Sequence, residues 1–158
     1  DEMLDKNYQE SAQSILKKGC HYEFGMALLG SGWHRRELAQ PENTYFRWTS
    51  NNNSFIDFWL EPMDYDLEIR IINAVSLKHL TELDLCVNNI SIPYEYDYNE
   101  GVVRIISTKI NQSMLKNKLL RIQFIHAQTL KHNSVFDSND NRKMGIAVNW
   151  IKIIPNQI

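Results

Sequence analysis

Residues 65–71 read Tyr-Asp-Leu-Glu-Ile-Arg-Ile, with apolar and charged side chains in strict alternation. Alternation with a period of two predicts a β-strand that buries one face and leaves the other in water. Residues 83–87, Leu-Asp-Leu-Cys-Val, repeat this pattern and lead into Asn88-Asn89, a pair typical of a turn. The two segments together predict an antiparallel sheet with one solvated face.

Working outward, short strand-like segments separated by Asn, Asp, Gly and Pro continue along most of the chain. About nine or ten such strands predict an all-β domain, an antiparallel β-sandwich of jelly-roll type, over residues 20–158. A polar loop is expected at residues 96–101 and a single helical turn within residues 108–117. The other predicted strands cover residues 21–29, 45–49, 55–60, 90–94, 102–106, 120–126 and 145–154.

The first nineteen residues have a different period. Leu4, Tyr8, Ile15 and Leu16 recur at helical spacing with Ala12 between them, and polar side chains fill the other face. Gly19 follows two lysines, which is typical of a helix end. Residues 1–19 therefore predict a short helix that links the sandwich to a preceding, catalytic domain.

Composition limits the classes of protein to which the chain can belong. With 158 residues, 43% hydrophobic and 23% charged, it fits one soluble domain. A net charge of −2 and scattered basic residues argue against a nucleic-acid partner. No apolar run is long enough for a membrane span or a signal peptide. Cys20 and Cys86 stand alone in unrelated segments, which predicts unpaired thiols and a cytoplasmic protein.

Motifs of the common enzyme classes are missing from the sequence. Gly30-Ser31-Gly32 lacks the lysine and the spacing of a phosphate-binding loop, and no Gly-x-Ser-x-Gly segment occurs. The five histidines lack the spacing of paired metal ligands. We therefore expect no catalytic residue, no cofactor and no metal in this chain.

Two segments combine aromatic, basic and acidic residues, and they have two possible interpretations. Tryptophan can offer a flat face to a sugar ring, while Asp, Arg and His side chains bind its hydroxyl groups. Alternatively, the tryptophans fill the core, and Glu37 pairs with Arg47 or Arg142 to fix a long loop. Trp59, inside a predicted strand, is expected in the core. The candidate ligand-binding residues are Trp33, His34, Glu37, Arg47, Trp48, Asp140 and Arg142.

The same segments carry a family resemblance. In order they read Gly-Trp-His-x-x-Glu at residues 32–37, Arg-Trp-Thr at 47–49 and Asp-x-Arg-x-x-Gly-Ile-Ala at 140–147. Over residues 21–154 the chain resembles a β-sandwich accessory domain appended to bacterial glycosyltransferases and methyltransferases that build surface polysaccharides. Asn88-Asn89 stands where such domains often have Asn-Gly, and Met144 where leucine is common.

The resemblance implies a non-catalytic module that binds a glycan weakly, as an accessory to a bacterial polysaccharide-biosynthesis enzyme. The alternative is a structural or protein-interaction module that docks an adjacent catalytic domain without binding glycan. A small hydrolase or lyase on the same scaffold is a third hypothesis. It would need a pair of carboxylates that face each other across a cleft.

Overall fold

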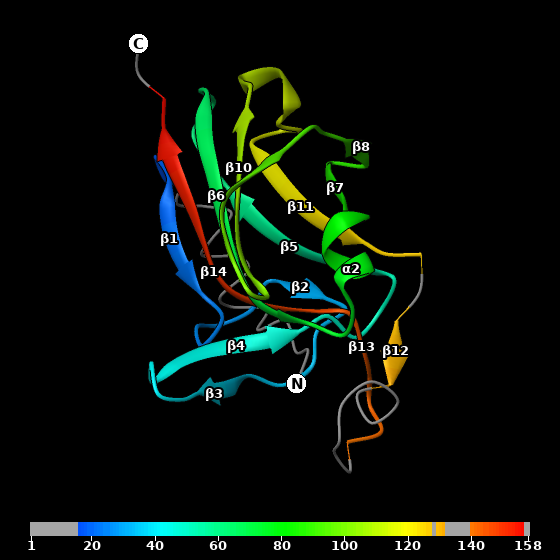
Figure 1. Cartoon of the computed structure of the whole chain (residues 1–158). Helices are drawn as coiled ribbons and strands as arrows, with labels where there is room; N and C mark the ends of the chain where they lie inside the picture. Colours follow the sequence, from blue (N-terminus) through cyan, green and yellow to red (C-terminus); the bar gives the residue numbers. More distant parts are fainter. Residues whose placement is uncertain (1–15, 128, 132–139, 157–158) are drawn as a thin grey trace.

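The chain forms two antiparallel sheets that pack face to face (Figure 1). The computed structural model describes residues 16–127, 129–131 and 140–156. This arrangement confirms the prediction of an all-β sandwich. No helix within these residues is long and apolar enough to cross a membrane.

The larger sheet has seven strands in the order β3-β4-β14-β6-β10-β9, and β1 also pairs with β14. Strand β14 pairs with β6 on one side, and on its other side with β4 near its start and β1 further along. The strands are β1 (Cys20–Glu23), β3 (Glu37–Ala39), β4 (Thr44–Trp48), β6 (Tyr65–Ala74), β9 (Glu95–Glu100), β10 (Val103–Ile110) and β14 (Ile146–Pro155).

The smaller sheet has five strands in the order β2-β5-β11-β7-β8. Its strands are β2 (Gly30–Ser31), β5 (Asn53–Trp59), β7 (Asp84–Val87), β8 (Ile90–Ser91) and β11 (Leu119–Ile125). A separate ribbon pairs β12 (Leu130–Lys131) with β13 (Lys143–Met144). Helix α2 (Leu77–Thr81) follows β6, and a 3-10 turn η1 (Gln112–Met114) follows β10.

The alternation in residues 65–71 correctly predicted a strand with one buried face. Tyr65, Leu67, Ile69 and Ile71 are fully buried on the inner face of β6, and the residues between them are only partly buried. The inner face of the smaller sheet contributes Ile56, Leu85, Leu120, Ile122 and Phe124 to the same core. One continuous apolar layer therefore holds the two sheets together.

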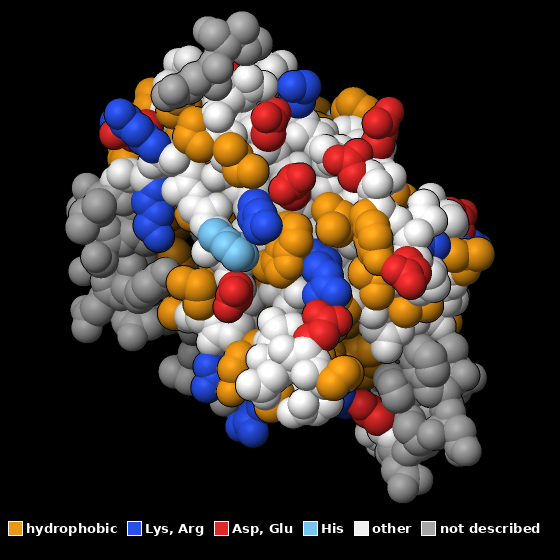
Figure 2. All heavy atoms as spheres, turned by 60° about the vertical axis from the view of Figure 1, so that its left-hand side comes forward, with side chains coloured by type: hydrophobic (Ala, Val, Ile, Leu, Met, Phe, Trp, Pro, Cys, Tyr) orange, Lys and Arg blue, Asp and Glu red, His pale blue; other side chains and the backbone are white. Residues whose placement is uncertain are grey.

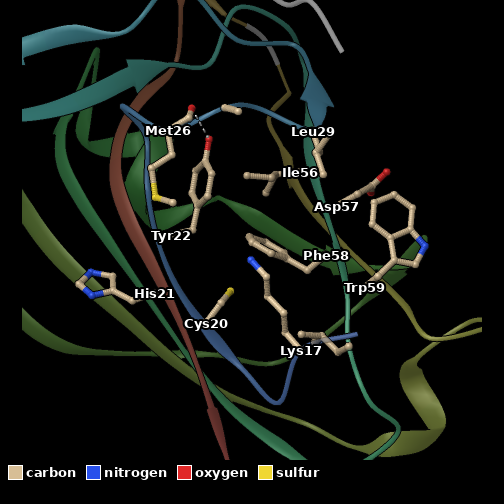
Figure 3. Close-up of a pocket in the computed structure, with 12 residues that line it drawn as sticks. Lys17, Cys20, His21, Tyr22, Met26, Leu29, Ile56, Asp57, Phe58 and Trp59 are labelled. Atoms are coloured by element: carbon tan, nitrogen blue, oxygen red, sulfur yellow. Dashed lines mark hydrogen bonds between the residues drawn. The ribbon is translucent and has the colours of Figure 1, made fainter. Parts of the chain in front are cut away.

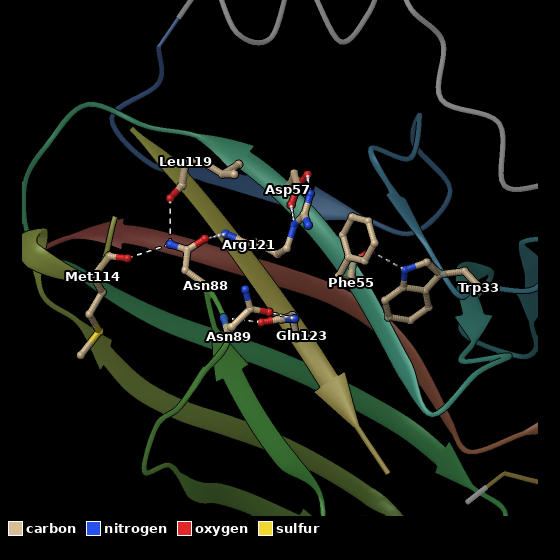
Figure 4. A network of polar contacts seen from close by, with 9 residues as sticks. All are labelled: Trp33, Phe55, Asp57, Asn88, Asn89, Met114, Leu119, Arg121 and Gln123. Carbon is tan, nitrogen blue, oxygen red and sulfur yellow. Dashed lines mark hydrogen bonds and ion pairs between the residues drawn. The ribbon is translucent and has the colours of Figure 1, made fainter. Parts of the chain in front are cut away.

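The predicted turn at Asn88-Asn89 is confirmed, and its residues do more than reverse the chain. Both have positive φ, 49° and 71°, a conformation that asparagine tolerates better than most residues. The Asn88 amide donates to the carbonyls of Met114 and Leu119, at 2.7 and 3.0 Å (Figure 4). Gln123 bonds both the backbone and the side chain of Asn89. The hairpin is thereby fixed to β11.

Two expectations about secondary structure need correction, and one helix was not predicted. Residues 96–101, predicted as a loop, lie mostly in β9, where an exposed edge strand needs no apolar face to pair with β10. Only Gln112–Met114 of the predicted turn is helical, because residues 108–110 still belong to β10. Helix α2 has only five residues, too few for a periodic pattern to predict it. The Ser76 side chain caps the helix by accepting a hydrogen bond from the backbone N–H of His79.

The predicted N-terminal helix lies almost entirely outside the described residues. The last four residues of its range, 16–19, are not helical. Instead Lys17 forms a bridge with Leu60, and its carbonyl accepts from the Glu61 amide at 2.8 Å. Gly19 has φ of 94°, and a Cβ there would come within 2.4 Å of the Ile153 carbonyl oxygen. Glycine is needed at this position because the backbone lies close to β14 and has a positive φ, and not because a helix ends there.

Trp33 should contribute strongly to stability. It is 2% exposed, contacts the rings of Phe24 and Phe124, and donates its Nε1–H to the Phe55 carbonyl at 2.9 Å. We expect Trp33→Ala to lower the free energy of unfolding by about 3–5 kcal/mol, since it opens a cavity between the sheets. Denaturant unfolding would measure this, with exposed Tyr45→Ala as control; equal losses in the two variants would contradict it.

Candidate functional site

The structure divides the seven predicted site residues into two groups. Trp33, Arg47 and Trp48 are buried, at 2%, 7% and 3% exposure. His34, Glu37, Asp140 and Arg142 are partly exposed. The hypothesis that Trp33 offers an open ring to a ligand is therefore wrong, since both sheets cover the indole.

The buried members hold the end of the sandwich together. Arg47 donates from Nη1 to the His34 carbonyl at 3.0 Å and from Nε to the Phe24 carbonyl at 3.3 Å. Trp48 packs in a second, small core with Val75, Met144 and Ala147. A buried guanidinium needs such partners because leaving its N–H groups unsatisfied would be costly. These residues fit the structural interpretation.

The exposed members form an ionic cluster, as the sequence suggested for Glu37 and Arg142. The Arg142 guanidinium lies 3.2 Å from Glu37 and 2.6 Å from Asp140. Hydrogen bonding to Asp140 raises the pKa of Arg142, while desolvation acts against it. His34 bonds the Lys143 carbonyl through Nε2 at 2.6 Å. The cluster thus ties β3 to the segment before β14, far away in sequence.

Arg142→Ala should cost about 1 kcal/mol of unfolding free energy. Removing the guanidinium leaves two carboxylates without their cation, but Glu37 and Asp140 stay 36% and 24% exposed and keep part of their hydration. Chemical denaturation would measure the loss. Lys109→Ala, which breaks the exposed pair with Asp66, is the matched control and should change stability by less than about 0.5 kcal/mol. A loss no larger than the control's would show that the cluster is merely solvated.

An apolar slot opens between β1 and β5, bordered by Cys20, Tyr22, Phe58 and Trp59 (Figure 3). Trp59, expected in the core, is half-buried here. The slot has a free volume of only about 40 Å³, far below the roughly 300 Å³ of small-molecule sites. Burial raises the pKa of the Cys20 thiol to about 11, despite the opposing charge of Lys17. A sugar does not fit, and the thiol is a poor nucleophile.

A second pocket lies beside helix α2, where two buried histidines meet. The rings of His79 and His126 are 5.3 Å apart, and Ser76 Oγ bonds His79 Nδ1 at 2.7 Å. Nδ1 of His126 is buried and has no hydrogen-bond partner among the residues that the structure describes. Within the described residues no group of three or more His, Cys, Asp or Glu side chains could hold a metal ion. Both side chains are buried, at 8% and 5% exposure, and pack as part of the core beside this pocket.

Acid should destabilise the fold through His126. Burial, and then the neighbouring His79, lower the pKa of His126 from 6.5 to about 4. The unfolded chain binds this proton first, so stability is lost as the pH falls from about 6.5 to 4 and the loss then levels off. We expect the contribution to be about 2–3 kcal/mol. The free energy of unfolding would be measured with urea at pH 7 and at pH 4.5. Its decrease between the two should be larger for wild type than for His126→Gln, and the exposed-site control His21→Gln should behave like wild type.

The outer face of the larger sheet carries the most varied exposed chemistry. Strand register aligns its side chains into two rows that run across β1, β14, β6, β10 and β9. The aromatic row consists of Glu23, Trp150, Arg70, Ile105 and Tyr98. The polar row beside it consists of His21, Lys152, Glu68, Ser107 and Glu95. Figure 2 views the molecule from the side of β1 and β14, where charged and hydrophobic side chains are interspersed.

Trp150 lies near the middle of this face, half-buried. Lys152 Nζ sits 4.5 Å from its ring centroid, and His21 contacts it edge-on at 6.0 Å. Across the strand pair, Arg70 is held by two hydrogen bonds to Glu42 and one to Asn149 Oδ1. A flat apolar ring thus lies beside a guanidinium that is held in place and beneath a lysine ammonium group. Sequence analysis missed Trp150, since its strand shows no motif; its flanking by Asn149 and Lys152 was the available signal.

An open hollow continues the polar row toward the far end of the sheet. Its volume is about 780 Å³, within the range of ligand sites. Glu68, Glu95 and Ser107 of the polar row line it, together with Asp66, Tyr94, Thr108, Lys109 and Asn111. Carboxylate, amide and hydroxyl groups beside an aromatic ring are suited to hydrogen-bonding the hydroxyl groups of a sugar.

Comparison with known proteins gives no assignment. No family model, no curated protein and no solved structure matches this chain. Function must therefore be argued from the residues described above.

Proposed function

We propose that the chain is a non-catalytic carbohydrate-binding module of jelly-roll type, which binds glycan on the outer face of its larger sheet. The observation that carries the proposal is Trp150, a half-buried indole on the outer sheet face, with Glu23 and Arg70 on the flanking strands and Lys152 over its ring. Burial of apolar C–H surface on the ring supplies affinity, and the polar groups orient the sugar. The resemblance to accessory domains of bacterial enzymes that build surface polysaccharides supports this proposal.

Binding should be weak. Sugar hydroxyl groups exchange hydrogen bonds with water for hydrogen bonds with protein, so the net gain is small. Lys152 must also leave the ring, which costs only the roughly 0.5–1 kcal/mol of an exposed cation–π contact. A dissociation constant of about 0.1–1 mM is expected, equivalent to roughly 4–5.5 kcal/mol.

The arrangement of carboxylates favours binding over catalysis. Asp66 and Glu68 lie on one strand, and Glu95 lies two strands away in the same polar row as Glu68. Glycosidases place two carboxylates on either side of the scissile bond. Side chains that share one open face supply no facing pair.

A structural or docking module remains the second candidate, and one observation favours it. Trp33, Arg47 and Trp48, which carry most of the resemblance, are buried and serve the core. If no glycan binds, this interpretation is the better one.

Trp150→Ala should remove most glycan binding and leave the fold intact. Two-dimensional NMR titration with oligosaccharide fragments of bacterial surface polysaccharides should shift resonances of β14, β6 and β1 in wild type but not in this variant. Trp59→Ala is the matched control, a half-buried tryptophan on the other sheet, and should bind like wild type. No shifts with wild type at about 10 mM sugar, ten times the weakest expected dissociation constant, would overturn the proposal.

A further inference from the structure

We propose, resting on the function above, that the outer face binds an internal stretch of a linear glycan, laid across the strands, rather than a terminal sugar. The aromatic row crosses five strands of this face. It contains two rings, Trp150 on β14 and Tyr98 on β9. Between them Arg70 pairs with Trp150 and with Ile105, and Ile105 pairs with Tyr98, so the four residues lie in one line across the sheet. Two rings on one face of one sheet can contact the same extended ligand.

The spacing of the rings sets the length of that ligand. Three strand intervals separate β14 from β9, because β6 and β10 lie between them. At about 4.8 Å an interval this gives about 14 Å, the length of about three linked sugar rings. One monosaccharide cannot reach both rings, whereas a tetrasaccharide can.

Tyr98 belongs to this face although Tyr96 does not. A β-bulge falls between the pairs Ile105–Tyr98 and Ile106–Tyr96, so the two tyrosines point to opposite sides of the sheet. Tyr96 packs against the core, whereas Tyr98 is 44% exposed. A hydrogen bond to Glu100 raises the pKa of Tyr98, and the charge of Arg70 acts in the opposite direction, so the guanidinium is within electrostatic reach.

The floor between the rings can support a chain. Ile105 is half-buried and offers apolar surface, while Arg70 is 19% exposed and held in place by Glu42 and Asn149. The polar row runs parallel, two residues away along β1, β14, β6 and β10, or about 6.7 Å, and three residues away along the bulged β9. A glycan on the aromatic row therefore has hydrogen-bonding groups along one flank for its whole length. Among the described residues the row runs from β1 to the edge strand β9, so a glycan chain can continue past either ring.

Chain length tests the inference. Linear gluco-, manno- and N-acetylglucosamine oligosaccharides of one, two, four and six residues would be titrated against the full chain by NMR and calorimetry. For the series that binds, affinity should rise about tenfold or more from the disaccharide to the tetrasaccharide and change little beyond it.

Variants separate this inference from the proposed function. Tyr98→Ala should weaken tetrasaccharide binding about five- to tenfold and leave disaccharide binding unchanged; Tyr98→Phe should restore the tetrasaccharide affinity. Trp150→Ala should weaken both. Equal affinity for disaccharide and tetrasaccharide, with no effect of Tyr98→Ala, would overturn the internal-chain inference and leave glycan binding intact. Absence of binding at every length would overturn both.

Discussion

The pairing of β6 with β14 is the constraint on which the rest of the structure depends. These two ten-residue strands form the middle of the larger sheet and set both of its faces. Their register places Ile69 opposite Ile151 inside and Arg70 opposite Trp150 outside. A slip of one residue would bring Arg70 and Glu68 into the core, at a cost that no neighbour could offset. The register that builds the core therefore also assembles the candidate binding face.

The residues of the motifs that carry the family resemblance mainly hold segments of the fold together. Trp33 fills the space between the sheets, Arg47 satisfies carbonyls of two preceding segments, and Arg142 joins Glu37 to Asp140. Apart from the Arg142–Asp140 pair, which is local, these contacts connect parts of the chain that are distant in sequence. Motifs of this kind are explained by closure of the fold without any ligand. An aromatic and charged motif is thus weak evidence for a binding site until the exposure of its rings is known.

The outer face has the opposite character. No short motif marks it, because its members come from five strands spread over more than 120 residues and meet only through register. Trp150 and Tyr98 stand 52 positions apart in the sequence. The half-buried indole, the bulge that turns Tyr98 outward and the adjacent hollow together make this face the better candidate.

The sequence by itself determined the all-β class, the alternating strands and the Asn88-Asn89 turn, because these depend on local period and backbone preference. It also suggested the pairing of Glu37 with Arg142. It did not determine that residues 96–101 are an edge strand, since an exposed strand needs no apolar pattern. Nor could it tell that Trp33 is covered and Trp150 partly open, because only the packing of one sheet on the other decides which ring meets solvent.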